Sequence, residues 1–350
     1  MKHTHKTPLR SISLLMILLV ILISMTAGCT PTGPATQPAT EVEPVVEENS
    51  SLDFAGKKIL WVDSYHEGYA WTDGIESGLH EILDGTGVEL KIIHMDTKRN
   101  SDEAFVQAAS SKARAEIEAF KPDVVIASED TVQKSLIVPF YKGADLPIIF
   151  IGVNWDASAY GYPTSNVTGM LEVELPDQVV NLLKANAKGE KLGYITIDTE
   201  TERKSVDIIN NTFFAGQMQI YWATNQDEFK AAYITAQQEV DILLIGNNAG
   251  TDTWNEAEMK QFVLENTSIP TGAVRDWMAP YAILTVAKSA KETGIWAAQT
   301  ALSILGGTPV SEIPVTQNKK GELIINLDLA DKLDIIFAPS LLKNAVILGE

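Results

Sequence analysis

Short apolar runs rich in β-branched residues alternate with longer amphipathic segments over most of this 350-residue chain. A short uninterrupted apolar run is typical of a strand that is buried on both faces of a sheet. Strands that alternate with helices predict βαβ units and therefore a parallel sheet. The predicted strands are residues 58–63, 90–94, 123–127 and 147–151, followed by 191–197, 218–222, 241–245 and 270–274. The less regular C-terminal part predicts two further strands at 281–286 and 321–327, with a helix at 288–305 between them.

The strand–helix alternation breaks off after the fourth strand and then begins again, which predicts an α/β protein with two doubly wound parallel-sheet lobes. We expect the N-terminal lobe at residues 55–155 and the second lobe at residues 156–280. Residues 281–350 are expected to form a crossover and C-terminal segment, and part of 281–325 to complete the first lobe. A chain that passes between two lobes more than once makes a hinge, with a cleft between the lobes.

The N-terminus has the pattern of a secretory signal. Three basic residues precede an apolar run at 14–23, which is shorter than the roughly 20 residues that a membrane-spanning helix needs. Cys29 is the only cysteine and follows Ala27-Gly28 directly. This arrangement resembles the lipobox of bacterial lipoproteins, although Thr26 stands where leucine is usual. The resemblance implies a signal peptide at 1–28 and acylation of Cys29, whose acyl chains would hold the protein at a membrane.

Residues 29–54 are rich in Pro, Thr and Glu and lack periodicity, which predicts a disordered tether. Residues 1–28 contain three basic and no acidic residues, so their removal changes the formal net charge from −19 to −22. A chain this acidic repels nucleic acid and anionic lipid. We therefore expect an exported protein, on the periplasmic face or the outer cell surface, that contacts the membrane through its lipid anchor only.

The residues that follow the strands are the candidates for ligand contact, because ligands of open α/β sheets bind beyond the carboxyl ends of the strands. After the first strand, aromatic and hydroxyl side chains crowd one turn. The alternative is that the aromatic residues of this turn only pack beneath the lobe, and that Ser128 and its neighbours only cap a helix. The candidates of the first lobe are Ser64, Tyr65, His66, Trp71, Thr72, Asp96, Ser128, Glu129, Asn154 and Trp155.

In the second lobe, Arg275 is a candidate to clamp a carboxylate and Asp276 to receive an ammonium group, which together would suit an amino acid. The alternative is a surface pair of Arg275 and Asp276 that binds nothing. Asn247 and Asn248 are either ligand contacts or turn residues in left-handed geometry. The full set of candidates in this lobe is Asp198, Thr199, Asn247, Asn248, Arg275, Asp276 and Trp277.

Catalysis and metal binding are not expected. Beyond Cys29 there is no cysteine, and the chain has neither a Gly-x-Ser-x-Gly elbow nor a Walker-type loop. After the signal peptide the histidines are His66, His80 and His94, whose spacing is not that of metal ligands. We therefore predict no enzyme activity, no cofactor and no metal.

Several segments, in order along the chain, resemble the ABC-transporter substrate-binding proteins of type I periplasmic-binding fold, in the group that includes tryptophan and tyrosine binders. Asn166-Val-Thr-Gly169 is similar to a motif that this group carries just after its first lobe. The other matching segments are residues 59–71, 291–298 with 304–309, and 325–330 with 338–342.

The resemblance implies a small-molecule ligand and partnership with the permease and ATPase subunits of an importer. An aromatic or other amino acid is the leading ligand, and a nucleoside-like or other small polar compound is second. Related modules also occur as sensory domains, so a lipoprotein that reports its ligand to a membrane receptor is the alternative. Neighbouring permease and ATPase genes would favour import, and a neighbouring kinase or cyclase gene would favour sensing.

Overall fold

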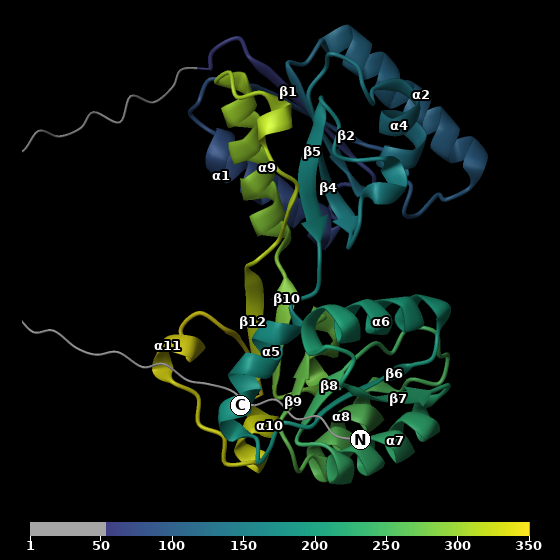
Figure 1. Cartoon of the computed structure of the whole chain (residues 1–350), viewed down its shortest axis with the longest axis vertical. Coiled ribbons are helices and arrows are strands. Elements are labelled where there is room, and N and C mark those ends of the chain that lie inside the picture. Colours follow the sequence, from purple (N-terminus) through teal and green to yellow (C-terminus); the bar gives the residue numbers. More distant parts are fainter. Residues whose placement is uncertain (1–53, 350) are drawn as a thin grey trace, which may run out of the picture. The chain divides into compact units, whose positions relative to one another are not determined.

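Two β-sheets organise residues 54–349, the part of the chain that the computed structural model describes (Figure 1). The predicted signal peptide, Cys29 and the predicted tether up to residue 53 lie outside the described residues. We call the six-stranded sheet with its helices the first lobe, and the seven-stranded sheet with its helices the second lobe. Among the helices of residues 54–349, none has the length and apolar character that crossing a membrane requires.

The sheet of the first lobe is parallel throughout, in the order β11-β5-β4-β3-β1-β2. Alternate side chains of β1 point to opposite faces, as in any strand. Ile59 and Trp61 pack beneath α1 and α9, whereas Leu60 and Val62 pack beneath α2. The strands are β1 (Lys58–Asp63), β2 (Glu89–His94), β3 (Val124–Ser128), β4 (Ile148–Asn154), β5 (Val167–Glu172) and β11 (Thr316–Gln317), and the helices are α1 (Ala70–Leu83), α2 (Glu103–Phe120), α3 (Glu129–Val132), the π-helical η1 (Gln133–Ile137), α4 (Val138–Phe140) and α9 (Ala290–Leu305).

The sheet of the second lobe has the order β13-β12-β10-β9-β8-β6-β7. Neighbouring strands pair in parallel except β10 with β12, so that β12 and β13 run opposite to the other strands. Tyr194 of β6 packs with α5 and α6, and Ile195 packs on the opposite face with α7 and α8. The strands are β6 (Leu192–Ile197), β7 (Gln219–Ala223), β8 (Ile242–Ile245), β9 (Thr271–Ala273), β10 (Leu284–Lys288), β12 (Gly321–Asn326) and β13 (Val346–Leu348), and the main helices are α5 (Pro176–Leu183), α6 (Glu200–Phe214), α7 (Gln226–Glu239), α8 (Glu256–Asn266), the 3-10 helix η4 (Asp276–Tyr281), α10 (Leu327–Lys332) and α11 (Pro339–Leu342).

The chain passes between the two lobes three times. It leaves the first sheet after β5 and enters the second lobe at α5, then returns from β10 to α9, and crosses again from β11 to β12. The first sheet thus includes β5, which lies beyond residue 155, and is completed by β11 from the C-terminal part of the chain. The predicted fold class of two doubly wound, parallel-sheet lobes is confirmed, with the β10–β12 pairing as the one antiparallel pairing between the named strands of the described sheets.

Helices α1 and α9 lie side by side on one face of the first sheet (Figure 1). Glycines at their contact allow the two backbones to approach closely. A Cβ atom added at Gly294 of α9 would overlap the carbonyl oxygen of Ile75 and lie 3.0 Å from the backbone nitrogen of Leu79. One added at Gly78 of α1 would lie 2.7 Å from the backbone nitrogen of Ile295. The returning helix α9 is therefore seated on the first lobe through backbone contact.

Candidate functional site

The aromatic turn after β1 converges on the first residue of α3. Strands β1 and β3 are neighbours in the sheet, so the turns at their carboxyl ends meet. The Tyr65 hydroxyl donates a hydrogen bond to Glu129 Oε2 at 3.1 Å, and Trp71 Nε1 donates one to Glu129 Oε1 at 3.2 Å. Three predicted ligand residues are thus brought together, with Tyr65 and Trp71 bonded to the carboxylate of Glu129.

Glu129 is buried although it carries a carboxylate, with 8% of its surface exposed. Burial raises its pKa well above the usual range, and the nearby charges of Glu172 and Asp63 raise it further, against the opposing effects of the Tyr65 hydrogen bond and Lys288. A buried carboxyl group at the carboxyl end of a parallel strand is a candidate for a functional role.

The ammonium group of Lys98 lies over two tyrosine rings of this turn. The Lys98 ammonium is 4.5 Å from the centroid of the Tyr65 ring and 4.8 Å from that of Tyr69, and the two rings meet edge to face. Burial, together with the charge of Glu129, raises the pKa of the Tyr65 hydroxyl, so this hydroxyl remains a hydrogen-bond donor.

Other predicted residues of the first lobe are bonded within the lobe. The Ser64 hydroxyl is buried against Thr97 Oγ1 at 2.7 Å, and the Ser128 hydroxyl accepts a hydrogen bond from Trp61 Nε1 at 2.5 Å. Asp96 binds the guanidinium of Arg99 through both carboxylate oxygens, at 2.7 and 2.8 Å. Hydrogen bonding to Arg99 lowers the pKa of Asp96. These contacts hold the strand-end turns of the lobe in place.

Asp63, which ends β1, is a charged group that the sequence analysis did not single out. Its Oδ2 accepts hydrogen bonds from Thr72 Oγ1 at 2.9 Å and from the His94 imidazole at 3.2 Å, whereas its Oδ1 is buried without a partner. The bond to Asp63 raises the pKa of His94, against the effect of partial burial. His66 lies nearby, 3.7 Å from Asp96, with its Nδ1 buried and unbonded.

In the second lobe, Arg275 is enclosed by two glutamates. Its guanidinium lies 3.0 Å from Glu202 and 3.3 Å from Glu174, and 8% of the side chain is exposed. Burial acts to lower the pKa of Arg275, but Tyr194, Glu174 and Glu202 together raise it above its ordinary value. The alternative of a surface pair between Arg275 and Asp276 is wrong, because Arg275 binds Glu174 and Glu202 while Asp276 is exposed and accepts a bond from the Trp277 backbone.

Asn247 links this cluster to an exposed indole. Its side chain donates to Glu202 at 3.2 Å and accepts from Trp277 Nε1 at 3.3 Å, and 54% of Trp277 is exposed. Its neighbour Asn248 is partly buried in the same turn. The Trp277 ring also lies 6.0 Å from the guanidinium of Arg275. Trp277 is therefore an aromatic surface that the second lobe presents beside its buried charges.

The remaining predicted residues occupy the starts of helices and the end of β4. Thr199 caps α6 by accepting a bond from the Glu202 backbone at 3.1 Å, and Asp198 binds Arg203 through both oxygens, at 2.6 and 2.5 Å. Asn154 is exposed at the end of β4. The Trp155 ring meets Phe213 of α6 edge to face with centroids 6.3 Å apart, so it connects the first lobe to the second.

Four further charged residues were missed, three of them where the chain crosses between the lobes and one, Glu202, in the first turn of α6. Glu172 ends β5 and forms an ion pair with Lys288, which ends β10; Glu174 and Glu202 bind Arg275. Burial acts to lower the pKa of Lys288, but Glu172 and Glu174 raise it above its ordinary value. Glu172 and Lys288 could have been recognised by their positions, because each is a charged residue at the end of a strand from which the chain crosses to the other lobe.

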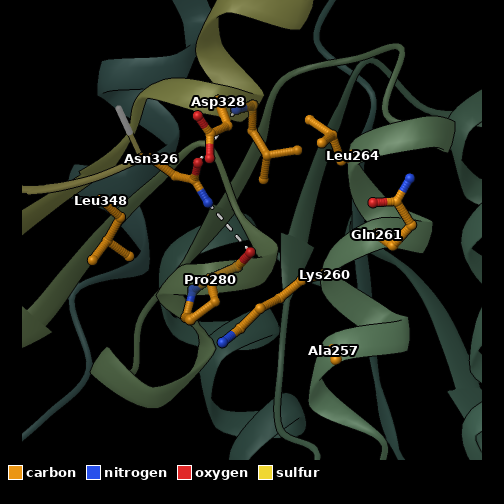
Figure 2. A pocket seen from close by; sticks show the side chains of 10 residues that line it. Ala257, Lys260, Gln261, Leu264, Pro280, Asn326, Asp328 and Leu348 are labelled. Atoms are coloured by element: carbon orange, nitrogen blue, oxygen red, sulfur yellow. Dashed lines mark hydrogen bonds between the residues drawn. The ribbon is translucent and has the colours of Figure 1, made fainter.

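A cavity of about 350 Å³ lies elsewhere, between α8, η4, the start of α10 and β13 (Figure 2). None of the predicted ligand residues lines it. Its wall includes Lys260, Pro280, Asn326 and Leu348, and the Asn326 amide donates to the Pro280 carbonyl. Within residues 54–349, no group of three His, Cys, Asp or Glu side chains is arranged to hold a metal ion.

A sequence model of the family "ABC transporter substrate binding protein" matches residues 66–347. No curated protein sequence matches the chain. Among solved structures, the ligand-free, open form of CD0873, a substrate-binding protein with adhesive properties from Clostridium difficile, is similar with a TM-score of 0.63 and 19% identity, over 83% of this chain and 99% of that one.

Two further structures are similar over comparable lengths. The ABC domain from Streptococcus pneumonia in complex with L-Trp gives a TM-score of 0.50 and 18% identity, over 84% of this chain and 99% of that one. An ABC transporter solute-binding protein from Bradyrhizobium sp. BTAi1 with bound bis-tris gives a TM-score of 0.53 and 14% identity, over 83% of this chain and 90% of that one. At these identities the similarity concerns the fold.

Proposed function

Because the chain belongs to the ABC transporter substrate-binding protein family, we propose that it captures one small organic molecule between its two lobes and delivers it to a permease with an ATPase subunit. The observation that supports this most directly is the convergence of strand-end residues. Tyr65, Trp71 and Glu129 meet in the first lobe, while Arg275 and Trp277 stand at the end of β9 in the second. The three crossings of the chain would serve as the hinge.

The protein is proposed to act outside the cytoplasm, held by acyl chains on Cys29. The short apolar run before Cys29 and the single cysteine support this location. The acidic tether would let the body stand off the membrane surface. Reporting the ligand to a membrane receptor is the alternative role, and a gene for a kinase or cyclase next to this one would favour it.

An aromatic or other amino acid is the leading ligand. The aromatic turn at Tyr65, Tyr69 and Trp71 offers rigid rings and hydrogen-bond donors, and a structural neighbour from Streptococcus was solved with L-Trp. A nucleoside-like or other small polar compound is the second candidate. Arg275, first considered as a carboxylate clamp, is bonded to Glu174 and Glu202, so we assign it to support of the site instead of direct carboxylate binding.

A thermal-shift screen of the full-length protein in detergent tests the proposal. We expect at least one amino acid to raise the melting temperature, because a ligand at 100 times its Kd stabilises the folded state by about 2.7 kcal/mol. Nucleosides, sugars and aromatic amines complete the panel. A panel in which no amino acid shifts the transition would remove the leading ligand, and intact recovery of the bound compound would separate binding from turnover.

A further inference from the structure

Glu129 is a buried carboxylate that binds no cation among the described residues. Its hydrogen-bond donors are the neutral Tyr65 hydroxyl and Trp71 indole, at 3.1 and 3.2 Å. Lys288 is close enough to act on its charge, but the Lys288 ammonium is bonded to Glu172. Buried carboxylates are normally paired, because leaving water costs free energy that neutral donors compensate only in part.

The backbone at Glu129 is held in an unfavourable conformation. Its φ of 70° lies in the left-handed region, which residues other than glycine, asparagine and aspartate adopt rarely. The carboxylate is also seated directly against Gly152 of β4, where an added Cβ would lie 2.6 Å from Glu129 Cδ. A strained residue that the surrounding structure holds in place is a frequent feature of binding sites.

The surroundings of Glu129 attract positive charge. Asp63 and Glu172 lie close enough to raise its pKa, and Asp63 Oδ1 is itself buried without a partner. The nearby Tyr65 and Tyr69 rings already hold the ammonium of Lys98 over their faces, at 4.5 and 4.8 Å. Aromatic faces beside a carboxylate are the standard chemistry for recognising an organic cation.

We propose that Glu129, walled by Tyr65 and Trp71, is the subsite that receives a protonated amine of the ligand. This inference rests on the proposed function and defines its ligand class: an organic molecule with a cationic nitrogen, attached to an apolar or aromatic body that packs on the rings. The amine would supply the positive charge that Glu129 lacks. The ammonium of an amino acid meets this requirement, and so does an amine that has no carboxylate.

Matched sets of compounds separate the contribution of the amine from that of the rest of the ligand. Each set contains an amino acid, the amine that lacks its carboxylate and the acid that lacks its amine: L-tyrosine, tyramine and 3-(4-hydroxyphenyl)propionate, and likewise L-tryptophan, tryptamine and indole-3-propionate. Putrescine and choline are added as organic cations that lack an aromatic ring. Isothermal titration of the full-length protein is expected to detect binding of amines and amino acids, and none of the amine-free acids.

The Glu129→Gln variant keeps the shape and the acceptor oxygen of the side chain but removes its charge. We expect it to weaken binding of every cationic ligand by about 30-fold or more, because one partner of a buried charge pair is lost. Its unliganded melting temperature should equal or exceed that of the unmodified protein, since burial already disfavours the charged form of Glu129 when no cation is bound and the amide fills the same space. Glu118→Gln, the same change on an exposed side chain of α2, is the matched control and should leave tyramine affinity within about threefold.

Each result bears on the inference in a defined way. Binding of an amine-free acid that is equally tight in the unmodified protein and in Glu129→Gln would overturn the amine subsite and leave the proposed function standing. A Glu129→Gln variant that binds poorly because it melts at a much lower temperature would make Glu129 a structural residue and overturn the subsite as well. Failure of the whole panel, acids included, would overturn both the subsite and the leading ligand.

Discussion

Replacing Gly294 with alanine is expected to lower the free energy of unfolding by about 3 kcal/mol, near the upper end of typical overpacking effects. The added methyl would overlap the Ile75 carbonyl oxygen and crowd the Leu79 nitrogen, which are backbone atoms that cannot move aside as a side chain can. The gain in helix propensity from glycine to alanine, about 1 kcal/mol, only partly offsets this. Urea unfolding followed by circular dichroism measures the change.

Gln299→Ala, on the exposed side of the same helix, is the control and should change stability by no more than about 0.5 kcal/mol. A Gly294→Ala protein as stable as its parent would mean that α9 is not seated on α1 through backbone contact. Since α9 is the segment by which the chain returns from the second lobe to the first, that result would also contradict the way the first lobe is completed.

Arg275→Met is expected to destabilise the protein by about 3–5 kcal/mol, because it leaves Glu174 and Glu202 buried without their cation. The methionine fills similar space, so the loss reports mainly on charge. The midpoint and slope of urea unfolding give the free energy. If the effect were under about 1 kcal/mol, the guanidinium would not be the charge that holds these two carboxylates.

Arg203→Met is the matched control for this change. Arg203 also binds a carboxylate through two nitrogens, but 56% of its side chain is exposed. An exposed ion pair contributes about 0–1 kcal/mol, so the free energy of unfolding of this variant should be close to that of the unmodified protein. The contrast between the two arginines tests burial as the cause of the difference.

Much of the fold follows from local sequence pattern. The first eight predicted strands correspond to β1–β4 and β6–β9. Most of them are short apolar runs buried on both faces of the sheet, whereas β2 and β7, at the sheet edges, are only partly buried. Strand β5 was not predicted, since Val167–Glu172 is interrupted by Gly169, against which the Phe150 ring packs, and ends in a charged residue. The antiparallel pairing of β12 with β10 also could not be predicted from local sequence, because the direction of a strand depends on the path of the connecting chain.

The sequence predicted which candidate residues stand at strand ends, but not the partners that they bind in the structure. The rule that ligands bind beyond strand ends placed Tyr65, Trp71 and Glu129 among the candidates, and the register of β1 beside β3 brings them together. The partners of Arg275 are 101 and 73 residues away along the chain. Such contacts form only when segments far apart in the chain are assembled, so local pattern offered Arg275 either a ligand carboxylate or the neighbouring Asp276.

A crystal structure of the protein with the tightest-binding compound of the panel is the most direct test of the central claim. We predict that the ligand contacts Tyr65, Trp71 and Glu129 from the first lobe and Trp277 from the second, with its amine on the Glu129 carboxylate. A ligand bound in the cavity between α8 and β13 (Figure 2), or one that touches a single lobe only, would contradict capture at the facing strand ends.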